Sequence, residues 1–182
     1  MFTVSGQEYT FEDLKPFVTG PQKVRVTREV KSSIQLSRRV LENKISSGKT
    51  IYGVNTGFGA LSQQHIDKKD QMQLQLNLVR SHSAGVGKPF EPGVTRAILF
   101  LKLINFCQGY SGVRWDVVAL LRDFINHDML PVIPSKGSVG ASGDLAPLSH
   151  MSLALIGEGE VLFKDRSISS STAYKKTGLN PL

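Results

Sequence analysis

Three neighbouring residues, Ala141, Ser142 and Gly143, could build a reactive group from the backbone alone. In a tight bend the amide nitrogen of Gly143 can attack the carbonyl carbon of Ala141, because glycine puts no side chain beside its nitrogen. Loss of water from the closed ring gives an imidazolone, and elimination of the Ser142 hydroxyl leaves an exocyclic methylene. The product would be a strong carbon electrophile, which no standard side chain supplies.

The surrounding sequence, KGSVGASGDLAPLSH (136–150), predicts a glycine-rich loop that runs directly into an apolar helix. We expect Gly137 and Gly140 to tolerate the strained backbone of the bend. The helix is expected to begin near Leu145. Its N-terminal amides would point towards the ring and favour the negative charge that develops as a nucleophile adds.

The segment GSVGASGDLAPLSH resembles the prosthetic-group signature of the aromatic amino acid ammonia-lyases. In that family an Ala-Ser-Gly tripeptide cyclises autocatalytically to methylidene-imidazolone. The resemblance implies that Ala141, Ser142 and Gly143 form this group here. It also implies that Asp144 helps the cyclisation.

Two further segments are similar to the same family and occur in the family's order. YGVNTGFG (52–59) resembles its mobile loop, which implies that Tyr52 reaches the substrate and acts as the base for the β-proton. NLVRSHSAGVG (77–87) resembles the segment that contacts the substrate side chain. The pair Ser81-His82 is similar to that of the histidine ammonia-lyases, whereas the phenylalanine and tyrosine lyases usually carry Phe-Leu or His-Leu.

The resemblance implies non-oxidative elimination of ammonia from L-histidine to give trans-urocanate. His82 would bind or orient the substrate imidazole, with Ser81 supporting it, and the electrophile would add to either the amine or the imidazole ring. The other histidines, His65, His127 and His150, are interpreted as structural. Alternatives are a phenylalanine or tyrosine ammonia-lyase, an aminomutase with the same group, or an inactive truncated chain that only associates with other subunits.

The chain has 182 residues, 40% of them hydrophobic, and its mean hydropathy is −0.10, which is typical of one globular domain. We predict a mainly α fold with small β-hairpins at its edges. The resemblance implies that residues 1–182 are the N-terminal, prosthetic-group-bearing portion of an aspartase/fumarase-like helical lyase, truncated before the central helical bundle. It also implies a homotetramer whose active sites collect residues from more than one subunit.

Composition argues against several other classes of protein. The net charge is +7 and the pI about 9.6, but the basic residues are dispersed, so we expect no nucleic-acid partner. No apolar run is long enough to span a bilayer and no secretory signal is recognised, and the single Cys107 excludes an internal disulfide, so we expect a cytoplasmic protein. Asn43 stands where a P-loop before SSGKT needs glycine, and the histidines are too widely spaced for a local zinc motif, so we expect no nucleotide and no metal.

Hydrophobic periodicity and capping residues predict the order of elements. We expect a hairpin over 1–11, a short helix opened by a Thr10–Asp13 capping box, and a helix from Thr27 to Gly48. Loops are expected at 50–62, 83–90 and 129–143. Further helices are expected over 67–82, 91–106, 114–128 and 145–159, followed by a hairpin over 160–169 and a last short helix.

Overall fold

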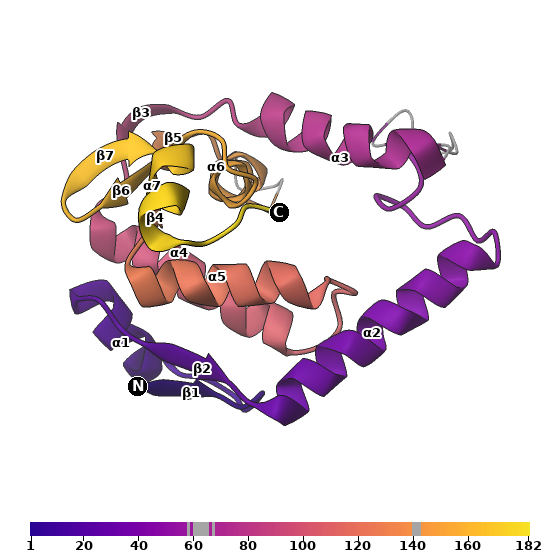
Figure 1. Cartoon of the computed structure of the whole chain (residues 1–182), viewed down its shortest axis with the longest axis horizontal. Coiled ribbons are helices and arrows are strands. Elements are labelled where there is room, and N and C mark those ends of the chain that lie inside the picture. Colours follow the sequence, from indigo (N-terminus) through magenta and orange to yellow (C-terminus); the bar gives the residue numbers. More distant parts are fainter. Residues whose placement is uncertain (58, 60–65, 67, 140–142) are drawn as a thin grey trace.

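The computed structural model describes residues 1–57, 59, 66, 68–139 and 143–182. The described chain is mainly helical, with small sheets at its edges, which confirms the predicted fold class (Figure 1). In chain order the elements are β1 (Phe2–Val4), α1 (Phe11–Thr19), β2 (Val24–Val26), α2 (Arg28–Ser46), α3 (Lys68–His82), β3 (Val86–Pro89), α4 (Pro92–Cys107), α5 (Trp115–His127), β4 (Leu130–Pro131), β5 (Pro134–Lys136), α6 (Leu145–Leu155), β6 (Glu160–Phe163), β7 (Arg166–Ser169) and α7 (Ser170–Thr177).

Helices α4 and α5 form the centre of the molecule, and α1, α2 and α6 pack around them (Figure 1). Their facing side chains are fully buried, among them Leu99 and Leu103 of α4 and Leu121 and Phe124 of α5. Cys107, the last residue of α4, is also buried, and desolvation raises the pKa of its thiol to about 12. Both helices were predicted from the sequence, and their apolar side chains supply much of the core.

The hairpin expected over residues 1–11 is wrong. Strand β1 pairs in parallel with β2, so that Phe2 lies opposite Val24, and α1 forms the crossover between the two strands. The side chain of Asn126 on α5 completes this sheet: its Oδ1 accepts a hydrogen bond from Val24 N at 2.7 Å, and its Nδ2 donates to Val24 O at 3.0 Å. The pairing of β1 with β2 thus depends on residues distant in the sequence. The local alternation of apolar and polar residues over 1–11 cannot reveal it.

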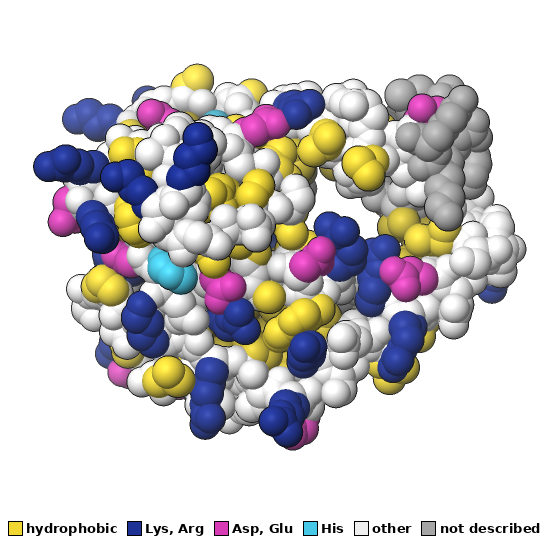
Figure 2. All heavy atoms as spheres, in the orientation of Figure 1, with side chains coloured by type: hydrophobic (Ala, Val, Ile, Leu, Met, Phe, Trp, Pro, Cys, Tyr) yellow, Lys and Arg dark blue, Asp and Glu magenta, His cyan; other side chains and the backbone are white. Residues whose placement is uncertain are grey.

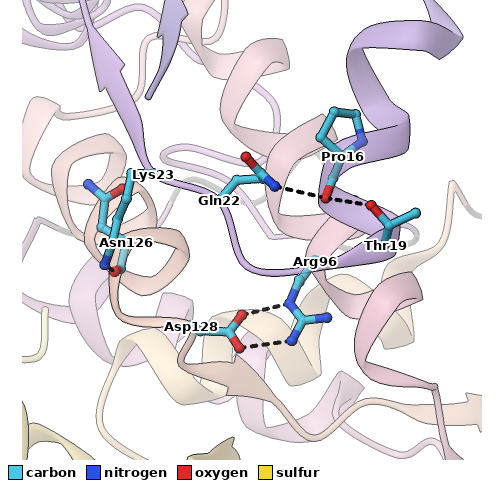
Figure 3. A network of polar contacts seen from close by, with 7 residues as sticks. All are labelled: Pro16, Thr19, Gln22, Lys23, Arg96, Asn126 and Asp128. Carbon is cyan, nitrogen blue, oxygen red and sulfur yellow. Dashed lines mark hydrogen bonds and ion pairs between the residues drawn. The ribbon is translucent and has the colours of Figure 1, made fainter.

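Hydrogen bonds and an ion pair connect the end of α5 to α4 and to the segment before β2 (Figure 3). Arg96 on α4 donates to both carboxylate oxygens of Asp128, at 2.7 and 2.8 Å. Asp128 follows α5 and has a φ of 50°, so the helix ends in a left-handed residue whose side chain is engaged by Arg96. Lys23 Nζ donates to the carbonyl oxygen of Asn126 in the same region.

The C-terminal end of α2 and the N-terminal end of α3 project beyond the core and are connected by the segment after Ser46 (Figure 1). The space-filling view is hollowed between them, and Lys and Arg side chains are spread over the same face (Figure 2). An open groove along α2 includes Leu36 and Val40, and Tyr110 from the loop after α4 lines the same groove. These three side chains are 57%, 48% and 90% exposed, so the groove is an uncovered apolar surface.

The predicted hairpin over 160–169 is confirmed: β6 and β7 are antiparallel, with Glu160 opposite Ser169. Two of the expected loops, however, contain strands. β3 pairs antiparallel with β5, and β4 joins β6 as the third strand of the β6–β7 sheet. These strands have two to four residues each, and their partners are distant in the sequence. Their only local signal is a high content of proline and glycine, which is typical of loops. Among the described helices, none is both long and apolar enough to cross a membrane.

Candidate active site

The glycine-rich segment before α6, residues 137–144, is called the prosthetic loop below. Ala141 and Ser142 lie outside the described residues. At the far end of the loop Gly143 has a φ of 66°, and nothing lies within 4 Å of the position that a Cβ would take. Asp144 follows, also left-handed with a φ of 59°, and α6 begins at Leu145 as predicted.

Asp144 joins the two ends of the prosthetic loop. Its Oδ1 accepts a hydrogen bond from Ser138 Oγ at 2.6 Å, and its carbonyl oxygen accepts from Leu148 N at 3.1 Å in the first turn of α6. Three features of this segment fit a group formed by cyclisation. The Ser138–Asp144 bond joins the ends of the loop, Gly143 is left-handed with space beside it, and the N-terminus of α6 follows directly. Ser138 was missed by the sequence analysis, which gave a role to Asp144 alone.

Gly137 was expected to relieve backbone strain, but it serves close packing instead, since its φ does not lie in the left-handed region. A Cβ at Gly137 would lie 3.1 Å from Gly85 Cα and 3.2 Å from Ala146 Cβ. Three segments therefore meet at Gly137: the turn after α3, the start of the prosthetic loop and the first turn of α6. Among the described residues of the loop, Gly143 and Asp144 have left-handed conformations, and Gly140 lies outside the described residues.

We predict that Gly137→Ala destabilises the protein by about 1–3 kcal/mol, because the new methyl group must push apart a backbone atom and a helix side chain. Urea unfolding would measure the loss. Gly20→Ala is the matched control: Gly20 has an extended backbone with a φ of −177°, and nothing lies within 4 Å of its added Cβ. Equal unfolding midpoints for the two variants would contradict the packing role of Gly137.

Ser81 and His82 end α3, as predicted. The carbonyl oxygen of Leu78 lies 2.9 Å from His82 Nδ1, and Ser81 Oγ lies 3.1 Å from the same nitrogen. A carbonyl can only accept, so Nδ1 carries a proton, an assignment inferred from this hydrogen-bond geometry. The neutral ring then keeps its lone pair on Nε2, where it can accept a hydrogen bond or a proton.

The turn after His82 connects this pair to the prosthetic loop. Gly85 lies against Gly137, and the next residues form β3, in which Val86 lies opposite Lys136 of β5. Gly85 N also donates to His150 Nε2 at 3.0 Å. The structure thus places the turn that follows Ser81–His82 against Gly137, the first residue of the prosthetic loop.

His150 lies on α6 and was interpreted as structural, and its bond to Gly85 N is a structural contact. Burial lowers the pKa of its imidazole, and the bond requires an unprotonated Nε2. The folded pKa therefore lies below the ordinary value of 6.5, so the unfolded chain binds more protons between these two values. In that window stability rises with pH.

We predict that the free energy of unfolding falls as pH drops below 6.5, and that the fall is smaller in His150→Gln, whose side chain does not titrate. Urea unfolding at about pH 5 and about pH 8 would measure this difference, since the two values bracket an ordinary histidine pKa. The control is His127→Gln, because His127 is exposed and its Nδ1 faces Asp123 O of its own helix. The same pH dependence in wild type and His150→Gln would refute the prediction.

Tyr52 lies in a turn after α2 that Asn55 organises. Asn55 is buried, its Oδ1 accepts from Ile51 N at 2.7 Å, and its Nδ2 donates to Lys49 O at 2.9 Å. No role was predicted for Asn55 from the sequence, although asparagine within a glycine-rich turn is a signal for such backbone contacts. Tyr52 itself is 65% exposed. The nearby Phe58 and His65 lie outside the described residues.

The turn that carries Tyr52 lies against α3, some distance along that helix from Ser81–His82. It contacts α3 through Gly53, whose carbonyl oxygen accepts from Gln75 Nε2 at 3.3 Å. Gln75 precedes His82 by seven residues, or about 10 Å along the helix axis. In Figure 1 the turn lies near the end of α3 that is remote from β3. The turn of Tyr52 and the Ser81–His82 pair therefore lie at different positions along α3 in this chain.

A cavity of about 360 Å³ borders the prosthetic loop. Its apolar walls come from Phe90, Ile98, Leu101, Pro147 and Leu148, and its polar lining includes Ser138, Asp144 and Lys102. Burial lowers the pKa of the Lys102 ammonium. A largely apolar cavity with a few polar groups is typical of small-molecule sites. In the part of the chain that the structure describes, no cluster of three or more His, Cys, Asp or Glu residues could hold a metal ion.

Comparison with known proteins gives consistent matches along the whole chain. A histidine ammonia-lyase from Staphylococcus saprophyticus is 44% identical over 98% of this chain and 36% of its own length. The ergothionase of Treponema denticola superposes over the whole chain with a TM-score of 0.95 at 30% identity, over 36% of its length. A tyrosine aminomutase from Streptomyces globisporus does so with a TM-score of 0.92 at 38% identity, over 34% of its length.

The chain thus spans about a third of the length of the relatives that it matches. The fold agreement covers every described element, so the predicted helical lyase fold is confirmed. The sequence profile of the aromatic amino acid lyases matches residues 9–182, which is nearly the entire chain. This protein therefore belongs to the aromatic amino acid lyase family.

Proposed function

We propose that this chain is the prosthetic-group-bearing part of an enzyme that eliminates ammonia from L-histidine and gives trans-urocanate. In this reaction a base takes the proton from Cβ, and the electron pair of that C–H bond becomes the second bond between Cα and Cβ. The Cα–N bond breaks, and its electron pair leaves with the nitrogen. No oxidant or reductant is needed, so the atoms and electrons balance without a redox partner.

The contact between Gly85 and Gly137 is the observation that supports this proposal most directly. It holds the turn that follows Ser81–His82 against the start of the segment that is proposed to cyclise. Both segments match a family whose named relatives include histidine ammonia-lyases. A histidine that can recognise an imidazole is thereby connected to a loop that can carry an electrophile.

The residues of this chain have distinct roles in the proposed reaction. When formed from Ala141, Ser142 and Gly143, the methylidene-imidazolone supplies the electrophile that makes the amine and the β-proton easier to remove. His82 accepts a hydrogen bond from the substrate imidazole through Nε2, and Ser81 and the Leu78 carbonyl keep its Nδ1 protonated. The N-terminus of α6 favours negative charge at the loop, and Asp144 holds the loop closed through Ser138.

Tyr52 is proposed as the base that takes the β-proton, acting in the site of a neighbouring subunit. Its turn contacts α3 through the Gly53 carbonyl, and its side chain is 65% exposed. The exposed apolar groove along α2 supports assembly, since a monomer rarely leaves such a surface uncovered. We propose a homotetramer.

Two measurements on the naturally occurring, assembled protein test this function. Its intact mass should fall short of the sequence by two water molecules, one lost in ring closure and one from the Ser142 hydroxyl. Incubation with L-histidine should release ammonia and urocanate, which is followed by its ultraviolet absorbance. A full mass with no product from histidine would refute the proposal.

A tyrosine-specific enzyme with the same group is the second candidate, because the Streptomyces globisporus tyrosine aminomutase is 38% identical over the whole chain. Such an enzyme would show the same loss of two waters. It would convert L-tyrosine to coumarate or to β-tyrosine, which chromatography separates, and it would leave L-histidine unchanged. The substrate therefore distinguishes the two functions where the mass cannot.

A further inference from the structure

We propose that His150 is a positioning residue, whose neutral imidazole holds the turn after Ser81–His82 in register with the prosthetic loop. This inference rests on the proposed function and adds to it a residue that touches neither the substrate nor the reacting atoms.

The bond from Gly85 N to His150 Nε2, at 3.0 Å, joins residues 65 apart in the sequence. A partly buried backbone N–H needs an acceptor, and His150 provides it from a helix rather than from a neighbouring strand. Since Nε2 accepts, the proton of the neutral ring lies on Nδ1. The side chain thus acts as a fixed acceptor on a rigid element.

The same face of α6 also contacts the prosthetic loop. Ala146 and His150 are four residues apart, so they lie on one side of the helix. A Cβ at Gly137 would lie 3.2 Å from Ala146 Cβ, and a Cβ at Gly85 would lie 3.1 Å from His150 Nε2. One helix face therefore sets the position of both segments, and neither segment has room for a side chain between itself and the helix.

The β3–β5 pairing begins at Val86, directly after Gly85. On the other side of Gly85, His82 ends α3 only three residues earlier. His150 holds the junction between these elements, where a small shift would rotate the end of α3 relative to the loop. A displacement of about 1 Å in a catalytic arrangement can reduce the rate by about 10²-fold.

The test compares His150→Gln with His150→Leu in the naturally occurring, assembled enzyme. Glutamine keeps a hydrogen-bond acceptor at the end of its side chain, whereas leucine keeps much of the volume without one. We expect His150→Gln to stay near wild type. In His150→Leu we expect the Gly85 amide to exchange its hydrogen at least about ten-fold faster. We also expect the kcat of His150→Leu to fall about 10- to 100-fold while KM changes little. For this comparison kcat is calculated from the concentration of chains that show the two-water mass deficit.

His127→Leu is the matched control, because His127 is exposed and its Nδ1 faces a carbonyl of its own helix. If His150 had only a packing role, His150→Gln and His150→Leu would both lower the melting temperature and the yield, and their kcat values would be the same. Equal exchange at Gly85 in the Gln and Leu variants would overturn the proposal, and so would equal kcat. A wild-type enzyme without the mass deficit would instead refute the proposed function, and the exchange rates would still show whether His150 holds Gly85.

Discussion

Replacing Ser142 by alanine in the assembled enzyme should abolish deamination, with kcat reduced by about 10³-fold or more. Alanine has no β-hydroxyl to eliminate, so the exocyclic methylene cannot form even where the ring closes. The variant should therefore lack at least one of the two water losses by intact mass. Its fold should persist, because residues 138 and 144 still join the ends of the loop.

The matched control is Ser152→Ala, which removes a hydroxyl from α6 that bonds Leu148 O of the same helix at 2.8 Å. This variant should keep the full mass deficit and a kcat close to wild type. Wild-type kcat in Ser142→Ala, or a loss of two waters there, would rule out the proposed electrophile.

Tyr52→Phe should lower kcat by about 10²- to 10⁴-fold, the range that general base catalysis contributes. The ring remains and only the hydroxyl is lost, so we expect a small change in KM and an unchanged mass deficit. Steady-state kinetics with L-histidine, together with intact mass, would separate a loss of proton transfer from a loss of the prosthetic group.

Tyr9→Phe is the control for this variant, since it also removes only a hydroxyl, one that accepts a hydrogen bond from Ser5 N at 3.0 Å outside the predicted site and the groove along α2. It should leave kcat unchanged. If Tyr52→Phe retained wild-type kcat, another residue would have to take the β-proton.

The helices could be predicted from the sequence because their signals are local. Thr27 Oγ1 accepts from Val30 N at the start of α2, Gly48 follows the end of that helix with a φ of 76°, and Asp13 accepts from Thr10 N at 2.8 Å before α1. Such signals lie within a few residues of one another. The elements that they delimit were confirmed.

The small sheets could not be predicted, because their strands find partners through the tertiary fold. Nothing near Phe2 indicates that Val24 lies opposite it, and nothing near Val86 indicates Lys136. Strands of two to four residues carry too little alternation to reveal a buried face.

The site divides in the same way. The chemistry of the Ala-Ser-Gly tripeptide is a property of three adjacent residues, and the resemblance assigned Tyr52 and His82. His150 and Gly85, by contrast, show their importance only when a turn and a helix 65 residues apart are brought together. Nothing in the sequence around His150 indicates that its imidazole accepts a hydrogen bond from the Gly85 amide.

The burial of Cys107 has a chemical consequence for the proposed electrophile. Activated methylenes react readily with thiolates, so the thiolate of an accessible cysteine could add to the methylene of its own chain or of a neighbouring copy. With its pKa raised to about 12 and its side chain within the core, this sulfur stays protonated and out of reach. The one cysteine among these 182 residues is thereby kept from reacting with the proposed group.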